Sequence, residues 1–298
     1  MKDISVKALA KINLGLDVVR KREDGYHEVR MIMQTVGIFD RITLEEKKEP
    51  GISVSTNLFF LPNDENNLVY KAAKLLMDEA GIKKGLSIQL EKHIPVAAGM
   101  AGGSADAAAV FVGVNQLFKL GLSKQELMEK GVKIGADVPY CILRGTALSE
   151  GIGEILTPLP ALKPCPILIA KPAISVSTKF VYENLHANEL KRHPDIDGML
   201  TAIREQNLDG VCSRMENVLE TVTVSQYPVI EEIKNFMKTH GAKNALMSGS
   251  GPTVFGIFED HNTAQEASAM LKHTHLAKNV FLTSSMNWHE RKGEVHGK

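Results

Sequence analysis

Apolar and polar residues alternate along the first part of the chain, most regularly in the segment VKALAKINLGLDV at residues 6–18. The even positions are apolar from Val6 to Leu16, and the polar residues fall on odd positions: Lys7, Lys11, Asn13 and Asp17. Successive side chains of a strand point to opposite faces, so this pattern predicts a strand with one buried face. Residues 28–44 predict one or two further strands, with Gly37 and Asp40 as break signals. The start of the chain is therefore expected to be rich in β structure.

A helical spacing of apolar residues replaces the alternation in residues 67–81 and predicts a helix that stops at Gly81. Residues 86–94 alternate again and predict a strand. A second helix is expected directly after a glycine-rich loop. A third is expected from Ser123, a favourable N-cap residue, to about Ile134.

Four prolines at positions 158, 160, 164 and 166 mark a change in the pattern. Closely spaced prolines prevent an internal helix and remove backbone donors, so a domain boundary is expected here. The predicted domains are residues 1–160 and 161–298. Helices and strands alternate in the second domain, which predicts an α+β layer. Its expected strands are 167–170, 245–247, 253–258 and 279–284, and its expected helices are 178–185, 210–222, 228–241 and 263–273.

The chain has 298 residues, and 35 Lys and Arg residues are balanced by 35 Asp and Glu residues. Because the net charge is zero, the composition does not favour a nucleic acid or a membrane as a partner. The cysteines Cys141, Cys165 and Cys212 are far apart, which is typical of free thiols in a reducing compartment. The first residues lack a secretion-signal pattern, and no run of about 18 apolar residues occurs. These features predict a cytoplasmic protein.

The segment PVAAGMAGGSADAAAVF at residues 95–111 places a glycine-rich loop directly before a helix of small residues. Backbone N–H groups and the helix dipole attract phosphate at such a junction, and Ser104 is expected to cap the helix. The alternative is a flexible turn that lets the helix pack closely. The loop matches neither the Walker A pattern nor the dinucleotide-binding fingerprint. For Asp106, a charge matched to the helix dipole and a role near a metal ion both remain open.

Five motifs are spread over almost the whole chain: AKINLGL at 10–16, DGYHEVRMIMQT at 24–35, PVAAGMAGGSADAA at 95–108, GADVPYC at 135–141 and LMSGSGPTVFG at 246–256. Together they resemble the superfamily of galactokinase, homoserine kinase, mevalonate kinase and phosphomevalonate kinase. Within it, they are similar to the branch that uses ATP to phosphorylate the 2-hydroxyl of a cytidine diphosphate conjugate of methylerythritol, a step of non-mevalonate isoprenoid synthesis. The resemblance implies a two-domain α+β fold with a ribosomal-protein-like N-terminal domain, a ferredoxin-like C-terminal domain and an active site between them.

The resemblance also implies ATP and Mg²⁺ as cofactors and assigns roles to residues of the motifs. Lys11 and Asp137 would be catalytic, the carboxylate taking the proton of the alcohol and the ammonium neutralising charge on the phosphoryl oxygens. Four residues would bind the substrate: Asn13, Tyr26, His27 and Tyr182. ATP would bind to the loop: Pro95, Val96, Ala97, Ala98, Gly99, Met100, Ala101, Gly102, Gly103, Ser104 and Ala105. No convincing metal ligand can be named.

Alternatives remain for single residues. Asp137 lies near glycine and proline, where an aspartate commonly serves as a turn or cap residue. The tyrosines of the proposed substrate site could instead pack at its rim. Ala101 would be strained by a left-handed backbone, so Gly99, Gly102 and Gly103 are expected to supply the flexibility of the loop.

The segment SGSGPT at residues 248–253 joins two apolar strands and is expected to form a hairpin turn. The resemblance also places its glycines near the phosphate loop, and the two expectations are compatible. The expected partner is a small-molecule substrate, and the expected state is a monomer or weak homodimer. Other small-alcohol kinases, a non-catalytic metabolite sensor and an RNA-binding module are the alternatives. The presence of both Lys11 and Asp137 argues against a sensor, and the balanced charge argues against an RNA-binding module.

Overall fold

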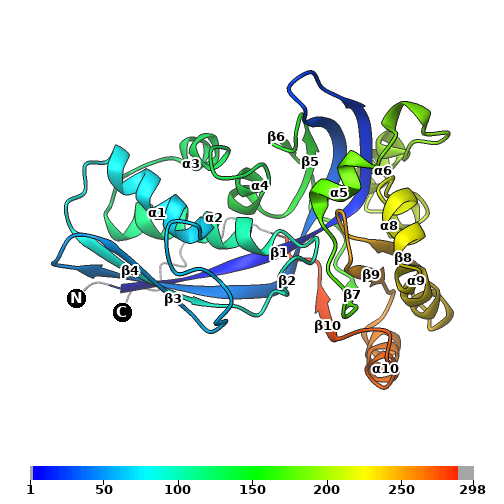
Figure 1. Cartoon of the computed structure of the whole chain (residues 1–298). Coiled ribbons are helices and arrows are strands. Elements are labelled where there is room, and N and C mark those ends of the chain that lie inside the picture. Colours follow the sequence, from blue (N-terminus) through cyan, green and yellow to red (C-terminus); the bar gives the residue numbers. More distant parts are fainter. Residues whose placement is uncertain (1–2, 288–298) are drawn as a thin grey trace.

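The computed structural model describes residues 3–287, which form two lobes side by side (Figure 1). The N-terminal lobe contains a six-stranded sheet in the order β3-β4-β2-β5-β6, with β1 paired antiparallel along β2. Helices α1 to α4 cover one face of this sheet (Figure 1). The elements are β1 (Asp3–Lys21), β2 (His27–Lys47), β3 (Ile52–Thr56), α1 (Leu68–Glu79), β4 (Gly85–Glu91), α2 (Gly102–Leu117), α3 (Lys124–Gly131), α4 (Val138–Leu143), β5 (Thr146–Glu150) and β6 (Ile155–Pro158).

The C-terminal lobe contains a four-stranded antiparallel sheet in the order β10-β7-β9-β8. Counted within this lobe the order is 4-1-3-2, with helices in both long connections, as in a ferredoxin-like split βαβ arrangement. This topology, together with the mixed N-terminal lobe, confirms the predicted two-domain α+β class. The elements are β7 (Pro166–Lys171), α5 (Thr178–Glu183), a 3₁₀ turn (Ala187–Glu189), α6 (Ile196–Arg204), α7 (Leu208–Cys212), α8 (Glu220–Gln226), α9 (Val229–Thr239), β8 (Asn244–Met247), β9 (Val254–Ile257), α10 (His261–Lys272) and β10 (Asn279–Ser284).

Strand β1 differs from the prediction of one buried face, because every residue from Ala10 to Val18 is buried. Its apolar residues Ile12 and Leu14 join a core cluster that includes residues of the C-terminal lobe. Along the edge of the strand, the Lys11 N–H donates to the Met100 carbonyl of the glycine-rich loop. The middle of β1 is therefore covered on both faces because it lies between the two lobes.

Strand β2 is continuous, so the predicted breaks at Gly37 and Asp40 are wrong. The Asp40 carboxylate is fully buried and accepts hydrogen bonds from the backbone N–H groups of His93 and Ile94. Asp40 therefore does not end a strand, and its carboxylate fixes the backbone of the residues that follow β4.

The start of helix α2 also differs from the prediction. Ala101 occupies the N-cap position with a left-handed backbone, and no side chain caps the helix. Ser104 lies inside the first turn, so the expected capping role of Ser104 is wrong. Asp106 is the fifth residue of the helix and is buried, which removes it from the exposed first turn.

The single helix predicted over residues 210–222 is wrong. The structure has α7 and α8 there, separated by residues 213–219, and α6 precedes them without having been predicted. The break allows Glu216 and Val218 to form backbone hydrogen bonds with Leu16 of β1. A tertiary contact therefore interrupts a segment whose local pattern favours one helix.

The proposed boundary near residue 160 falls in the irregular segment 159–165 between β6 and β7. Residues 288–298 of the second predicted domain lie outside the described residues. The two lobes share one apolar cluster, which includes Ile12 and Ile32 from the first and Ile169 and Phe255 from the second. Within residues 3–287, no helix combines the length and the apolar character needed to cross a bilayer.

Candidate active site

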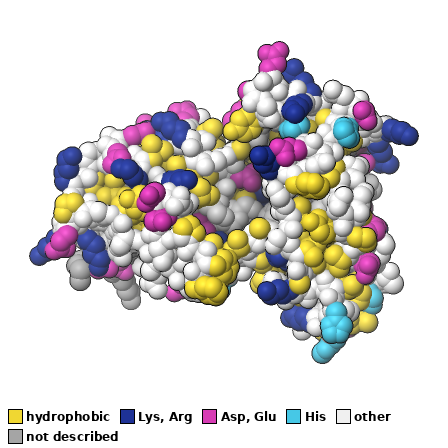
Figure 2. Space-filling model, viewed as in Figure 1, with side chains coloured by type: hydrophobic (Ala, Val, Ile, Leu, Met, Phe, Trp, Pro, Cys, Tyr) yellow, Lys and Arg dark blue, Asp and Glu magenta, His cyan; other side chains and the backbone are white. Residues whose placement is uncertain are grey.

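A cavity of about 990 Å³ lies between the two lobes, and Figure 2 shows the hollow that separates them. The N-terminal lobe contributes the glycine-rich loop, Lys11 and Asp137 to its lining. The C-terminal lobe contributes residues of α5 and of the turn after β8. Its volume lies at the upper end of the range typical of small-molecule sites, about 300–1,000 Å³.

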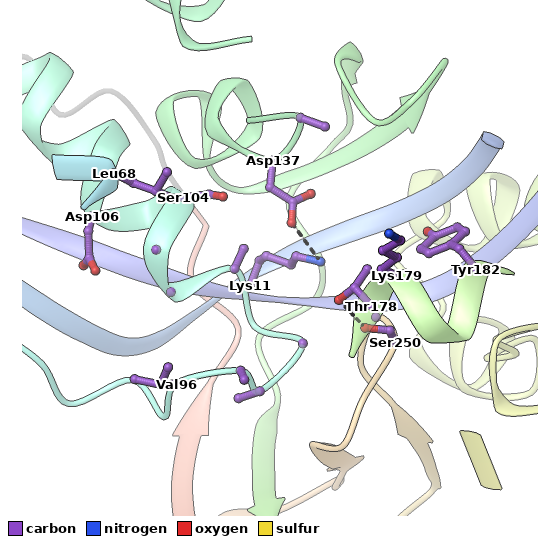
Figure 3. Close-up of a pocket in the computed structure, with 18 of the residues that line it drawn as sticks. Lys11, Leu68, Val96, Ser104, Asp106, Asp137, Thr178, Lys179, Tyr182 and Ser250 are labelled. Carbon is purple, nitrogen blue, oxygen red and sulfur yellow. Dashed lines mark hydrogen bonds and ion pairs between the residues drawn. The ribbon is translucent and has the colours of Figure 1, made fainter. Parts of the chain in front are cut away.

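Lys11 and Asp137 face each other in this cleft, with the lysine Nζ 3.6 Å from the carboxylate Oδ2 (Figure 3). The lysine side chain is only 6% exposed, whereas the aspartate side chain is 30% exposed. The Asp137 carboxylate is therefore accessible from the cavity, and the buried Lys11 ammonium contacts that carboxylate from the protein side. Asp137 precedes α4, but its side chain makes no capping hydrogen bond, so a capping role does not account for it.

Asn13 supports Lys11 from the same face of β1, as the two-residue spacing predicts. The Lys11 Nζ donates to Asn13 Oδ1 at 2.8 Å, and Asn13 Nδ2 lies 3.2 Å from the sulfur of Met31. Asn13 is fully buried, so in this arrangement it contacts the lysine and does not line the cavity. Its predicted contact with substrate stays a prediction.

The glycine-rich loop turns through three left-handed residues: Ala97, Gly99 and Ala101, with φ of 50°, 70° and 55°. Gly102 and Gly103 have ordinary helical backbone as the first residues of α2. Of the three glycines expected to supply the flexibility of the loop, only Gly99 has the left-handed backbone, and two alanines adopt the conformation that glycine prefers.

Gly99 is required by a close approach between the lobes. A Cβ atom at this position would lie 2.2 Å from the carbonyl oxygen of Ser248. The Ser248 hydroxyl in turn donates to the Gly99 carbonyl at 2.9 Å. The SGSGPT segment thus forms the connection between β8 and β9 and also contacts the glycine-rich loop, as both expectations for its position require.

Most of the predicted nucleotide-binding loop lines the cavity, but Met100 and Ala105 do not. Both side chains are buried, and they anchor the loop to the protein interior. Ser104 lines the cavity and points into it beside Asp137 (Figure 3). The nucleotide-binding role of the loop as a whole stays a prediction.

A buried ion cluster holds the start of α2 against the sheet. Lys92 Nζ lies 2.5 Å from Asp40 Oδ2 and 2.7 Å from Asp106 Oδ2. Burial raises the pKa of Asp106 well above its usual value, and the Lys92 charge opposes that rise. Asp106 therefore serves as an ion-pair partner of Lys92, which accounts for its buried position better than a dipole-matched charge does. It also lines the cavity, and a role near a metal ion stays a prediction.

Three aromatic residues lie at the other end of the cleft: Tyr26, His27 and Tyr182. The His27 and Tyr182 rings are 5.2 Å apart between centroids and tilted by 41°. Tyr26 remains 59% exposed. Burial lowers the pKa of His27, and the Lys21 charge lowers it further, which favours the neutral imidazole. The motif residue His27 thus meets Tyr182 from the second lobe, and Tyr26 lines the same cavity.

Several residues that shape this cleft have no role predicted from the sequence. Thr178 and Ser250 share a hydrogen bond of 2.8 Å that joins α5 to the turn after β8 (Figure 3). Asn217 is buried, and its amide donates to the carbonyls of Met247 and Gly249. Ser250 belongs to a motif that had been noticed, whereas Asn217 has no local signal because its partners lie far along the chain.

Comparisons with known proteins agree with this geometry. Residues 67–145 match the family model for the GHMP kinases N terminal domain, and residues 199–277 match the model for GHMP kinases C terminal. A 4-diphosphocytidyl-2-C-methyl-D-erythritol kinase of Lachnoclostridium phytofermentans is 58% identical over 94% of this chain and 96% of its own length. A kinase of the same name from Alkaliphilus metalliredigens is 48% identical over 97% of this chain and 100% of its own.

Solved structures give the same result. A crystal structure of 4-(cytidine 5'-diphospho)-2C-methyl-D-erythritol kinase is similar with a TM-score of 0.81 and 31% identity, covering 95% of this chain and all of that chain. A crystal structure of L. major mevalonate kinase shares the fold, with a TM-score of 0.75 at 17% identity, covering 96% of this chain and 97% of that chain. The chain therefore belongs to the GHMP kinase family, and within it to the 4-diphosphocytidyl-2-C-methyl-D-erythritol kinases.

Proposed function

We propose that this chain transfers the γ-phosphoryl group of ATP to the 2-hydroxyl of 4-diphosphocytidyl-2-C-methyl-D-erythritol, giving the 2-phosphate and ADP. The observation that carries the proposal is the Lys11–Asp137 pair, which faces a cleft between the glycine-rich loop and an aromatic cluster. The loop suits a triphosphate, the aromatic cluster suits a pyrimidine base, and the pair suits the alcohol between them.

In the proposed reaction the 2-hydroxyl oxygen attacks the γ-phosphorus, and the bond from that phosphorus to the β,γ-bridging oxygen breaks. The electron pair of the broken bond stays with ADP, and the hydroxyl proton passes to the Asp137 carboxylate. Lys11 orients that carboxylate and neutralises charge on the phosphoryl oxygens. Because phosphoryl transfer is largely a matter of positioning and electrostatics, the buried support of Lys11 by Asn13 matters for the rate.

The glycine-rich loop would bind the phosphates of ATP through backbone N–H groups at the start of α2, where the helix dipole favours an anion. The turn at Ser248 in the second lobe holds this loop in place through its hydrogen bond to the Gly99 carbonyl. A Cβ atom at Gly102 would lie 3.1 Å from Ile94 and 3.2 Å from Lys92, and one at Gly103 would lie 3.2 Å from Leu68, so a larger residue at either position would crowd its neighbours at the start of α2.

Mg²⁺ would enter with ATP and neutralise the charge of the β- and γ-phosphates. Among residues 3–287, no three His, Cys, Asp or Glu side chains gather as a protein-made metal site would require. This donor set fits a Mg²⁺ ion held mainly by phosphate and water, with the Ser104 hydroxyl as a ligand from the chain.

The cytosine base would bind among Tyr26, His27 and Tyr182. A neutral His27 can both donate and accept a hydrogen bond, and stacking on an aromatic ring contributes about 1–3 kcal/mol per base.

We place the enzyme in the cytoplasm as a monomer or weak homodimer with domains at 1–160 and 161–298. The burial of the free thiols Cys141, Cys165 and Cys212 is compatible with a reducing compartment.

The test is to incubate the purified protein with ATP, Mg²⁺ and the cytidylyl conjugate and to follow ADP. Mevalonate, homoserine and galactose serve as competing acceptors, because they are substrates of neighbouring kinases with this fold. We expect ADP formation with the cytidylyl conjugate and at least about a hundredfold lower kcat/KM with the others. Preference for one of the other alcohols would assign the protein to another branch of the superfamily. Absence of turnover with every acceptor would support the alternative of a non-catalytic metabolite sensor.

A further inference from the structure

Four lysines line the described part of the cleft, and they differ in how they are held: Lys11, Lys21, Lys92 and Lys179. Lys11 and Lys92 are buried and each lies against a carboxylate within the protein. Lys179, by contrast, has a side chain that is 82% exposed and a single long ion pair, 3.8 Å to Glu183 one helical turn away. An exposed pair of this kind contributes little, so its charge is available to a ligand at small cost.

The backbone that carries Lys179 is held firmly at the edge of the cleft. Lys179 is the second residue of α5, which Ser177 caps by accepting from the Phe180 N–H. The neighbouring Thr178 is tied to Ser250 by a hydrogen bond. Tyr182 follows three residues after Lys179 and therefore shares its face of the helix. A fixed backbone with an exposed, weakly paired ammonium group suits electrostatic capture of a ligand.

Figure 3 shows the Lys179 ammonium between Asp137 and the Tyr182 ring. If the function proposed above holds, this position of the Lys179 ammonium can be compared with the chemical groups of the substrate. The substrate has a base at one end, an alcohol at the other and a diphosphate between them. With the base at Tyr182 and the alcohol at Asp137, the diphosphate must lie between those two residues.

We propose that Lys179 binds the diphosphate of the cytidylyl substrate and so fixes the distance between the base and the reacting alcohol. The proposal rests on the proposed function, since it takes the substrate from there. On binding, the ammonium exchanges Glu183 for the doubly charged diphosphate, which is the stronger partner. Lys21 is the other exposed lysine, but β1 pairs it with His27, which places it at the base end of the site.

Calorimetric titration with cytidine and with cytidine diphosphate tests this role without catalysis. We expect Lys179→Met to weaken the binding of cytidine diphosphate about tenfold and that of cytidine less than about twofold. Lys179→Arg should retain most of the affinity. Glu183→Gln removes the competing carboxylate and should strengthen diphosphate binding. Lys74→Met is the matched control, because Lys74 forms a similar exposed pair with Asp78 away from the cleft.

The outcomes separate this proposal from the proposed function. If Lys179→Met binds both ligands as the wild type does, or loses both equally, Lys179 does not bind the diphosphate. A larger selective loss in Lys21→Met than in Lys179→Met would also overturn the proposal. If the wild-type protein binds neither cytidine nor cytidine diphosphate, the substrate assignment itself fails and the role of Lys179 with it.

Discussion

The Asp137 carboxylate is the single side chain on which the proposed chemistry depends most directly. Asp137→Asn keeps the shape of the side chain but removes its ability to accept a proton. General-base assistance contributes about 10²- to 10⁴-fold in rate, so we expect kcat to fall at least about a hundredfold. Affinity for cytidine diphosphate should remain, because the carboxylate acts on the alcohol. Steady-state kinetics and calorimetric titration measure the two effects.

Asp78→Asn is the control for this change, since Asp78 is exposed on α1 and paired with Lys74. A folded Asp137→Asn protein that loses less than about tenfold in kcat would show that Asp137 is not the base.

The left-handed backbone at Ala101 predicts an unusual effect of glycine. Ala101 has φ of 55°, a conformation that costs an alanine about 1–2 kcal/mol and a glycine almost nothing. Although glycine has more entropy to lose on folding, we expect Ala101→Gly to raise the free energy of unfolding by about 0.5–1 kcal/mol. Urea denaturation measures this difference.

Ala269→Gly provides the opposite case, because Ala269 is exposed in the interior of α10, where the backbone is helical. There the same substitution should lower the free energy of unfolding by about 0.5–1 kcal/mol. Equal destabilisation by both glycine substitutions would mean that Ala101 is not strained.

Residue-level inference from the sequence succeeds where the backbone is regular and fails where contacts between lobes set it. The two-residue spacing correctly places Lys11 and Asn13 on one face of β1, and their side chains are in contact. The conformation of Ala101 could not be read in the same way. Here the loop is set by the bond from Lys11 N–H to the Met100 carbonyl and by the packing of Gly99 against Ser248.

At the scale of elements, the buried cluster around Lys92 joins three of them: β2, the chain after β4, and α2. Asp40 is fully buried and Asp106 is 3% exposed, so Lys92→Met leaves two carboxylates in the interior without a cation. Removing one partner of a buried ion pair costs about 3–5 kcal/mol, and we expect a loss of that size. Urea unfolding of Lys92→Met, with Lys74→Met as the exposed control, measures it.

This loss should depend on pH in a known direction. Burial already raises the pKa of Asp106 in the folded protein, and removing the Lys92 charge removes the main force that lowers it. The folded variant therefore takes up a proton at higher pH than the unfolded chain, whose Asp pKa is about 3.9. The penalty from Asp106 is complete above the raised pKa and disappears as pH falls toward the unfolded value. A deficit that is constant or larger at pH 5 than at pH 8 would contradict this account.

Elements bounded by local signals were predictable, and elements shaped by distant contacts were not. The helix expected from Ser123 is α3, where Ser123 and Glu126 form a capping box, although it ends at Gly131 instead of Ile134. The helix expected over residues 210–222 is broken because backbone groups of that segment bind Leu16. This backbone pairing does not change the spacing of apolar residues in residues 210–222 or in β1, so the sequence pattern does not reveal it.

At the scale of the whole molecule, the candidate active site lies where the two lobes meet. Composition and periodicity placed the boundary near residue 160, but no local pattern brings Asp137 to Lys11 or Tyr182 to His27. Those pairings followed from the resemblance of the motifs to a known superfamily. In physical terms, Asp137 reaches Lys11 through the packing of α4 against β1 within the N-terminal lobe. Tyr182 reaches His27 only because the C-terminal lobe packs against the N-terminal lobe. Both pairings are properties of the assembled fold.

The shared apolar core predicts that the two lobes unfold together. Ile12 and Ile32 of the first lobe pack in one cluster with Ile169 and Phe255 of the second, all fully buried. Separation would expose this cluster, at about 1.5–3 kcal/mol for each large side chain, a sum comparable to the stability of a typical domain. We therefore expect one calorimetric transition whose van't Hoff and calorimetric enthalpies agree, and no cooperative transition for residues 1–160 expressed alone. Two resolved transitions in the full chain, or a cooperatively folded fragment 1–160, would show that each lobe has a sufficient core of its own. The cleft would then be an interface between independent domains, and the geometry of Lys11 and Asp137 would not depend on the second lobe.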